Sequence, residues 1–169
     1  GRMTDLIVGG GAVGTFLASA LVAGGRDVAI VRRRLGGSPR PGEITIVGRD
    51  GVRVARAVTE VAAPGDLPGP PDLIVFAVKA FDLADAVASC ANWPDAPALT
   101  PLNGVGAEEI VRAGRPDAGL IAGSLTVSLD LLPDGAVARL NRGGIGLAPV
   151  HGDVATTIDA LSAAFAAGG

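Results

Sequence analysis

The sequence is poor in cysteine, histidine and aromatic residues, and each shortage excludes a class of protein. Cys90 is the only cysteine, which excludes an internal disulfide and a multi-cysteine zinc site, and the lone His151 argues against a His-rich metal site. Four phenylalanines, one tryptophan and no tyrosine offer few rings for stacking on bases. With a net charge of −3 and no long basic run, we expect no metal and no nucleic-acid partner.

The size and composition of the chain are those of one folded domain. It has 169 residues, of which 49% are hydrophobic and 18% charged. A domain of this length buries roughly two-thirds of its unfolded surface and needs no disulfide or metal to fold. No internal repeat is visible, and we predict a single domain over residues 3–169.

The segment Leu6–Gly25 contains no charged residue, which admits three interpretations. It could be a signal peptide, with Ala18-Ser19-Ala20 as a cleavage site, or a membrane span of about 20 residues. Six glycines interrupt it, however, and they are spaced as in a ligand-binding turn. We therefore expect a cytoplasmic protein with no membrane partner.

The first 31 residues predict a βαβ unit. Residues 6–8 and 28–31 are short, wholly apolar runs, and residues 12–23 have the length and composition of a buried helix that ends at Gly24-Gly25. Strands that are apolar on both faces belong to parallel sheets covered by helices on both sides. The fold class predicted is therefore α/β, with a Rossmann-type doubly wound, mainly parallel sheet.

The remaining elements extend this pattern. A hairpin is predicted over 43–47 and 52–55, and the later strands, near the C-terminal end, are expected to be antiparallel. Further strands are predicted at residues 73–78, 98–102, 120–129, 136–140 and 145–147. Further helices are predicted at residues 81–91, 107–113 and 154–167.

The turn after the first strand fits the pattern G-x-G-x-x-G. The first glycine permits a tight turn, the second lets the backbone approach a diphosphate, and the third lets the helix pack closely on the sheet. The positive end of the helix then faces the phosphates. A plain tight turn in a glycine-rich chain is the alternative. The residues predicted to bind a dinucleotide here are Gly9, Gly10, Gly11, Ala12, Val13 and Gly14.

The residues after the second strand indicate which dinucleotide binds. NAD- and FAD-binding domains have an acidic residue there, which accepts a hydrogen bond from the ribose 2′-hydroxyl. This chain has Arg32-Arg33-Arg34 instead. A guanidinium binds a 2′-phosphate with two parallel hydrogen bonds, so Arg33 favours NADP(H). The alternative is a solvated basic loop.

Two polar residues follow the next predicted strands. Lys79, the only lysine of the chain, ends one strand, and Asn103 ends another. Ligands of open parallel sheets bind beyond the carboxyl ends of the strands, so both side chains could line one cleft beside the glycine turn. The alternatives are a surface lysine and an ordinary Asn-Gly turn.

Taken together, these motifs resemble ketopantoate reductase (2-dehydropantoate 2-reductase). The glycine motif, Arg33 and Val78-Lys79-Ala80-Phe81 are followed in register by Leu102-Asn103-Gly104-Val105-Gly106, and Gly146-Leu147-Ala148-Pro149 is similar to the family's Gly-x-x-Pro stretch. The resemblance covers nearly the whole chain. It implies NADPH-dependent reduction of a small-molecule 2-keto acid to a 2-hydroxy acid in pantothenate biosynthesis, with Lys79 and Asn103 near the nicotinamide and the substrate.

The chain also departs from the family pattern. The resemblance places the general-acid lysine in a helical C-terminal domain, and no lysine follows Lys79 here. Residues 126–129 occupy the position of a family strand near the cofactor with different side chains, so contacts there would rest on backbone. We expect the amino-terminal, cofactor-binding half of a reductase that binds NADPH without turnover, with exposed apolar surface that favours a homodimer.

Three other functions stay open. Opine and glycerol-3-phosphate dehydrogenases share this domain architecture, and their specificity depends on the other half of the protein. A non-catalytic NADP-sensing module would keep the glycine turn and Arg33 without using Lys79. A scaffold with no cofactor is the third.

Overall fold

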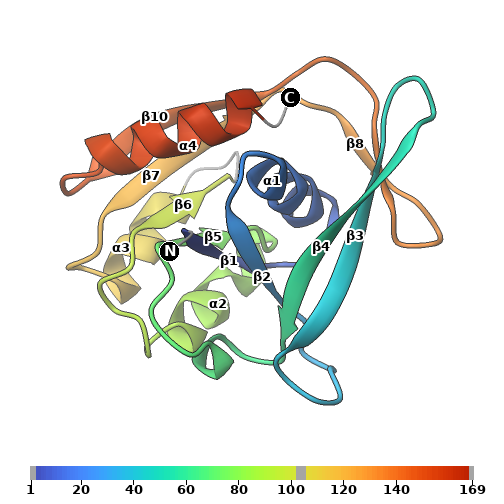
Figure 1. Cartoon of the computed structure of the whole chain (residues 1–169). Helices are drawn as coiled ribbons and strands as arrows, with labels where there is room; N and C mark the ends of the chain where they lie inside the picture. The colour runs from blue at the N-terminus through green and yellow to red at the C-terminus, as the bar shows by residue number, and fades with distance from the viewer. Residues whose placement is uncertain (1–2, 102–105, 168–169) are drawn as a thin grey trace.

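The chain folds into three layers, with one large sheet between two helical layers. The computed structural model describes residues 3–101 and 106–167 (Figure 1). The sheet has ten strands in the order β10-β7-β6-β5-β1-β2-β4-β3-β9-β8. One face packs on α2 and α3, and the other packs on α1 and α4. The α/β fold class is confirmed.

The bounds of the elements are as follows. The strands are β1 (Thr4–Val8), β2 (Asp27–Val31), β3 (Arg40–Val47), β4 (Arg53–Val61), β5 (Leu73–Phe76), β6 (Ala98–Thr100), β7 (Leu120–Leu125), β8 (Leu129–Leu131), β9 (Val137–Arg139) and β10 (Ile145–His151). The helices are α1 (Ala12–Ala23), α2 (Leu83–Ser89), α3 (Ala107–Gly114) and α4 (Ala155–Ala167), with short 3-10 turns η1 (Pro64–Asp66) and η2 (Ala80–Asp82).

The centre of the sheet is a parallel array with β1 in the middle. From β4 through β2, β1, β5 and β6 to β7, every neighbouring pair is parallel. The four residues of β5 are fully buried, as are Leu6 and Ile7 of β1, because helices cover both faces. The order of the strands reverses between β1 and β5, which is where ligands of doubly wound sheets bind.

Antiparallel strands extend the sheet at both edges, as predicted for the later part of the chain. β10 pairs with β7, and β8 pairs with β9. The prediction of one strand over 120–129 is wrong, because β7 ends at Leu125 and the chain then passes to the opposite edge of the sheet, where β8 begins. The strand predicted at 136–140 also has a parallel neighbour, since β9 pairs with β3 in the parallel sense.

Several predicted bounds need correction as well. The hairpin is longer than predicted, since β3 begins at Arg40 and β4 continues to Val61, where its end pairs in parallel with β2. β5 ends at Phe76, two residues early, because the chain turns there toward η2. The helix predicted at 81–91 begins only at Leu83 and ends at Ser89.

The sheet curves so that the edge formed by β4, β3, β9 and β8 wraps around α1 (Figure 1). Helix α1 contacts β3, β4, β8 and β9 as well as α4. Glycine permits the close approach to α4, because a Cβ at Gly24 would collide with the backbone of Ala164. The amino end of α1 is thus held at the carboxyl end of β1 by packing on several sides.

Arg115, at the end of α3, is a buried cation without a carboxylate partner among the described residues. Its guanidinium donates to the carbonyls of Cys90, Trp93 and Ala96 at 3.2, 2.5 and 2.7 Å. Burial lowers the pKa of Arg115 below its ordinary value. The three bonds join α3 to the segment between α2 and β6.

We expect Arg115→Met to lower the free energy of unfolding by about 2 kcal/mol, because hydrogen bonds to a charged donor are strong and each of the three carbonyls loses one. Urea denaturation measures the change. Arg112→Met is the matched control, since Arg112 lies on the same helix and is exposed. Equal losses in the two variants would contradict a structural role for the buried guanidinium.

Three further features concern function. In residues 3–101 and 106–167 no helix combines the length and apolar character needed to cross a bilayer. Within the same residues no three His, Cys, Asp or Glu side chains gather as a metal site. Cys90 is fully buried, and burial raises the pKa of its thiol, so it is a packing residue.

Candidate functional site

The glycine turn connects β1 to α1 at the point where the strand order reverses. Gly9 has a φ of +119°, in the region that favours glycine. A Cβ at Gly9 would also collide with the carbonyl of Ala77, which follows β5. The turn and the end of β5 therefore lie side by side, as the amide of Ala77 donating to the carbonyl of Val8 at 2.8 Å also shows.

The other two motif glycines have opposite surroundings. A Cβ at Gly14 would meet the carbonyl of Gly9 and would lie 3.2 Å from Cγ2 of Ile7, so this glycine lets α1 pack closely on β1. A Cβ at Gly11 would meet nothing within 4 Å. Gly11 is exposed and starts the helix, so the space beside its backbone is open to a ligand.

The amino end of α1 offers unpaired backbone donors. The amide of Thr15 makes the first helical bond, to the carbonyl of Gly11 at 3.0 Å. The amides of Ala12, Val13 and Gly14 precede it and have no acceptor within the helix. No side chain caps this end, and no acidic residue lies in the first turn. A diphosphate beside Gly11 would receive these donors and the positive end of the helix dipole.

Of the three arginines that follow β2, the structure brings Arg32 and not Arg33 against the glycine turn. Nη1 of Arg32 donates to the carbonyl of Gly10 at 3.4 Å, and its Nε donates to Oε2 of Glu60 at 3.2 Å. Arg33 is exposed and has no hydrogen bond or ion pair to the part of the chain that the structure describes. The sequence predicts that Arg33 binds the 2′-phosphate of NADP(H), and this role stays a prediction.

A charged hollow of about 440 Å³ adjoins the glycine turn. It lies between the turn, the β3–β4 hairpin and the connection from β8 to β9. At its rim Arg53 donates to Asp134 at 2.5 Å, and a hydrogen bond from the amide of Ala136 together with Arg53 holds the pKa of Asp134 below its ordinary value. The residues around the hollow include Gly10, Thr15, Arg32, Glu43, Thr45, Arg53, Glu60 and Asp134.

Lys79 lies beyond the carboxyl end of β5, at the same end of the parallel strands as the glycine turn that follows β1. It is exposed, follows β5 by three residues and precedes η2. Phe81, two residues later, is 80% exposed and forms an apolar surface next to it. Asn103 lies outside the described residues, so the predicted pairing of Lys79 and Asn103 in one cleft stays a prediction.

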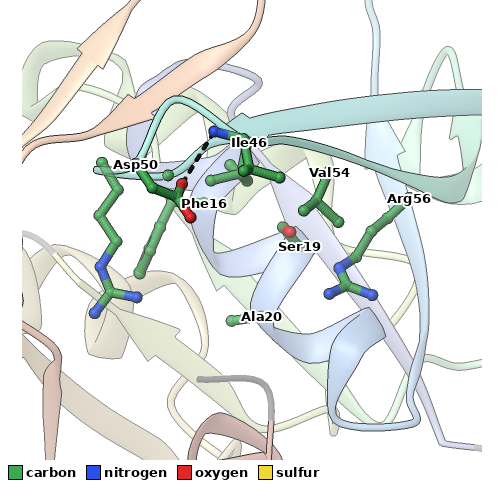
Figure 2. Close-up of a pocket in the computed structure, with 10 residues that line it drawn as sticks. Phe16, Ser19, Ala20, Ile46, Asp50, Val54 and Arg56 are labelled. Carbon is green, nitrogen blue, oxygen red and sulfur yellow. Dashed lines mark hydrogen bonds between the residues drawn. The ribbon is translucent and has the colours of Figure 1, made fainter.

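A second hollow, of about 290 Å³, lies farther along α1 (Figure 2). Phe16, Ser19 and Ala20 of α1 face Ile46 and Val54 of the hairpin across it. Neither the glycine turn nor Lys79 reaches this hollow. We therefore place the candidate site at the glycine turn.

The strand order, the reversal beside β1 and the glycine turn define a Rossmann-type nucleotide-binding domain. Residues 6–152 match a family model described as ketopantoate reductase PanE/ApbA. The chain belongs to this family, which confirms the resemblance seen in the sequence. The family takes its name from ketopantoate reductase, an oxidoreductase that acts on CH-OH groups.

Solved structures share the fold along the length of the chain. The 2-dehydropantoate 2-reductase from Methylococcus capsulatus superposes with a TM-score of 0.84 at 24% identity, covering 99% of this chain and 55% of that one. A D-mandelate dehydrogenase solved with NADH and anilino(oxo)acetate has a TM-score of 0.78 at 21% identity, covering 96% and 54%. An octopine dehydrogenase has a TM-score of 0.74 at 15% identity, covering 95% and 46%.

The chain spans about half the length of the structures that it matches. Identities below 25% show the shared fold and do not transfer a substrate. No curated protein sequence matches the chain at a significant level.

Proposed function

We propose that these residues bind NADP(H) and form the cofactor-binding half of an NADPH-dependent 2-keto acid reductase of the 2-dehydropantoate 2-reductase type, which acts in pantothenate biosynthesis. The observation that supports the proposal most is the open space beside Gly11, at the uncapped amino end of α1. This cradle fits a diphosphate, because a backbone without a side chain lets the phosphate oxygens reach the free amides.

The proposal gives the predicted residues the following roles. Gly9 and Gly14 shape the turn, and the amides from Gly11 to Gly14 hold the diphosphate. Arg33, exposed and without a described partner, binds the 2′-phosphate of the adenosine ribose. When bound, the cofactor supplies a hydride. Lys79 and Asn103 bind near the nicotinamide and the keto acid, as the family resemblance implies.

These 169 residues contain one lysine, Lys79, and the family resemblance places the general acid elsewhere. We therefore propose that they bind NADPH without reducing ketopantoate on their own. Homodimer formation and a cytoplasmic location stay predictions.

The direct test is titration with NADPH and NADH, followed by the fluorescence of the reduced nicotinamide. We expect saturable binding of NADPH, and we expect Arg33→Ala to weaken it by about tenfold while NADH binding changes little, because a charge-assisted bond to the 2′-phosphate is lost. Arg34→Ala is the matched control at the neighbouring exposed arginine. Equal losses for both nucleotides would remove Arg33 from the site, and no binding of either would refute the proposal.

The alternative substrate class is that of a related dehydrogenase. The octopine and mandelate dehydrogenases show that this fold also occurs in enzymes with other substrates. A panel of keto acids and amino acids, assayed with the full-length gene product, separates these activities. A non-catalytic NADP sensor would bind the cofactor and would leave all of these substrates unchanged.

A further inference from the structure

The carboxylate of Glu60 lies near the carboxyl end of β2, although Glu60 itself belongs to the neighbouring strand β4. Glu60 lies on β4 and is in register with Ile30 of β2, one residue before β2 ends. The chain just past β2 is held to the same part of β4, since the amide of Arg32 donates to the carbonyl of Val61 at 2.7 Å. The side chain of Glu60 is 17% exposed.

Arg32 connects this carboxylate to the glycine turn. One guanidinium spans the two groups, with Nη1 at 3.4 Å from the carbonyl of Gly10 and Nε at 3.2 Å from Oε2 of Glu60. The other carboxylate oxygen, Oε1, accepts a bond from Nε of Arg40 at 3.4 Å. Gly10, Arg32 and Glu60 all line the 440 Å³ hollow beside the turn. A ribose bound at the turn would therefore meet a fixed negative group as well as arginines.

We propose that Glu60 is a specificity-determining residue that opposes Arg33 in the choice between NADPH and NADH. This inference rests on the proposed binding of a dinucleotide at the glycine turn. Glu60 accepts a hydrogen bond from a ribose 2′-hydroxyl, the role that an acidic residue on the second strand has in NAD-binding domains. Toward a 2′-phosphate the same carboxylate is repulsive, and it also competes for Arg32.

The consequence is a moderate preference for NADPH, smaller than the arginines alone would produce. Arg32 and Arg40 each share their charge with Glu60, whereas Arg33 has no described partner. Replacing the carboxylate by an amide keeps the shape of the side chain, removes the repulsion and releases Arg32 toward the phosphate. Removing Arg40 has the opposite effect, because the negative charge of Glu60 is then less compensated.

The experiment measures Kd for NADPH and for NADH with the 169-residue chain and three variants. In Glu60→Gln we expect the ratio of the NADH Kd to the NADPH Kd to rise about tenfold, the effect of one charged contact. In Glu43→Gln, which removes from the same hollow a carboxylate that has no hydrogen bond or ion pair to a described arginine, we expect a change below about twofold. In Arg40→Gln, at a half-exposed position, we expect the ratio to fall.

The outcomes separate the two proposals. If the unmodified chain binds neither nucleotide, the proposed function fails and this inference fails with it. If the chain binds and Glu60→Gln leaves the ratio unchanged, or Glu43→Gln changes it equally, only the role of Glu60 is overturned. Melting curves identify a variant that does not fold. If Glu60→Gln is such a variant, the Arg40→Gln result decides, and an unchanged or higher ratio there refutes the inference.

Discussion

Gly11→Asp is expected to abolish dinucleotide binding without destabilising the protein. The new side chain would occupy the open space beside the turn, where nothing lies within 4 Å, and its charge would repel a diphosphate. Residue 11 is also the N-cap residue of α1, where no side chain caps the helix, and its φ of −76° and ψ of −164° form an extended conformation that any residue adopts. Aspartate is a preferred capping residue and interacts favourably with the helix dipole.

Cofactor binding and protein stability should therefore respond differently to Gly11→Asp. We expect NADPH affinity to fall by at least about a hundredfold, as the loss of several charged contacts at once implies, and thermal stability to stay equal or rise by a few tenths of a kcal/mol. Gly11→Ser is the matched control, since it caps the helix without a charge and should weaken binding less. Full NADPH affinity in Gly11→Asp would place the diphosphate elsewhere.

The sequence predicts most of the parallel centre of this fold because its signals are local. The first strand, α1 and β2 follow from two apolar runs, a helix-length segment and glycines at both ends of that segment. The bounds predicted for α1, residues 12–23, are those observed. Apolar runs with no alternation correctly indicated strands that are buried on both faces.

What the sequence could not predict depends on contacts between distant segments. Between β7 and β8, at residues 126–128, the chain crosses to the opposite edge of the sheet. There Oδ1 of Asn141 accepts a hydrogen bond from the amide of Ser128 at 2.9 Å, and no local sequence pattern predicts that contact. Arg32 and Glu60 are 28 residues apart, so the glutamate could not be placed beyond β2 without the register of β4. The hairpin predicted from the sequence ends at residue 55, before Glu60, so no local signal suggests this position for the glutamate.

Asp5 is another residue whose setting the sequence did not reveal. It precedes an apolar run, yet in the structure its side chain is fully buried and forms a two-bond pair with Arg26. Nε and Nη2 of Arg26 donate to the two carboxylate oxygens at 2.5 Å each. The pair joins β1 to the chain between α1 and β2, at the end of the sheet away from the glycine turn.

Arg26→Met is expected to lower the free energy of unfolding at neutral pH by about 3–5 kcal/mol, because it leaves the charge of Asp5 buried without a partner. The double variant Asp5→Leu/Arg26→Met should recover most of that loss, since it removes both charges. Arg53→Met is the control, because its pair with Asp134 is exposed and should leave the urea midpoint nearly unchanged. A double variant as unstable as Arg26→Met would show that packing, and not the stranded charge, causes the loss.

The pH dependence of the Arg26→Met loss identifies its cause. Burial raises the pKa of Asp5, and the hydrogen bonds and charge of Arg26 oppose that rise, so removing Arg26 leaves burial and the neighbouring Asp72, which both raise the pKa.

A carboxyl whose pKa is higher in the folded state holds its proton there while the unfolded chain has lost it. The contribution of such a carboxyl to folding stability is fully present below its pKa in the unfolded chain, about 3.9. That contribution is lost as the pH rises through its pKa in the folded state. The difference in unfolding free energy between Arg26→Met and the unmodified chain should therefore shrink from about pH 7 toward about pH 4. A difference that does not change with pH would mean that Asp5 stays ionised in the variant.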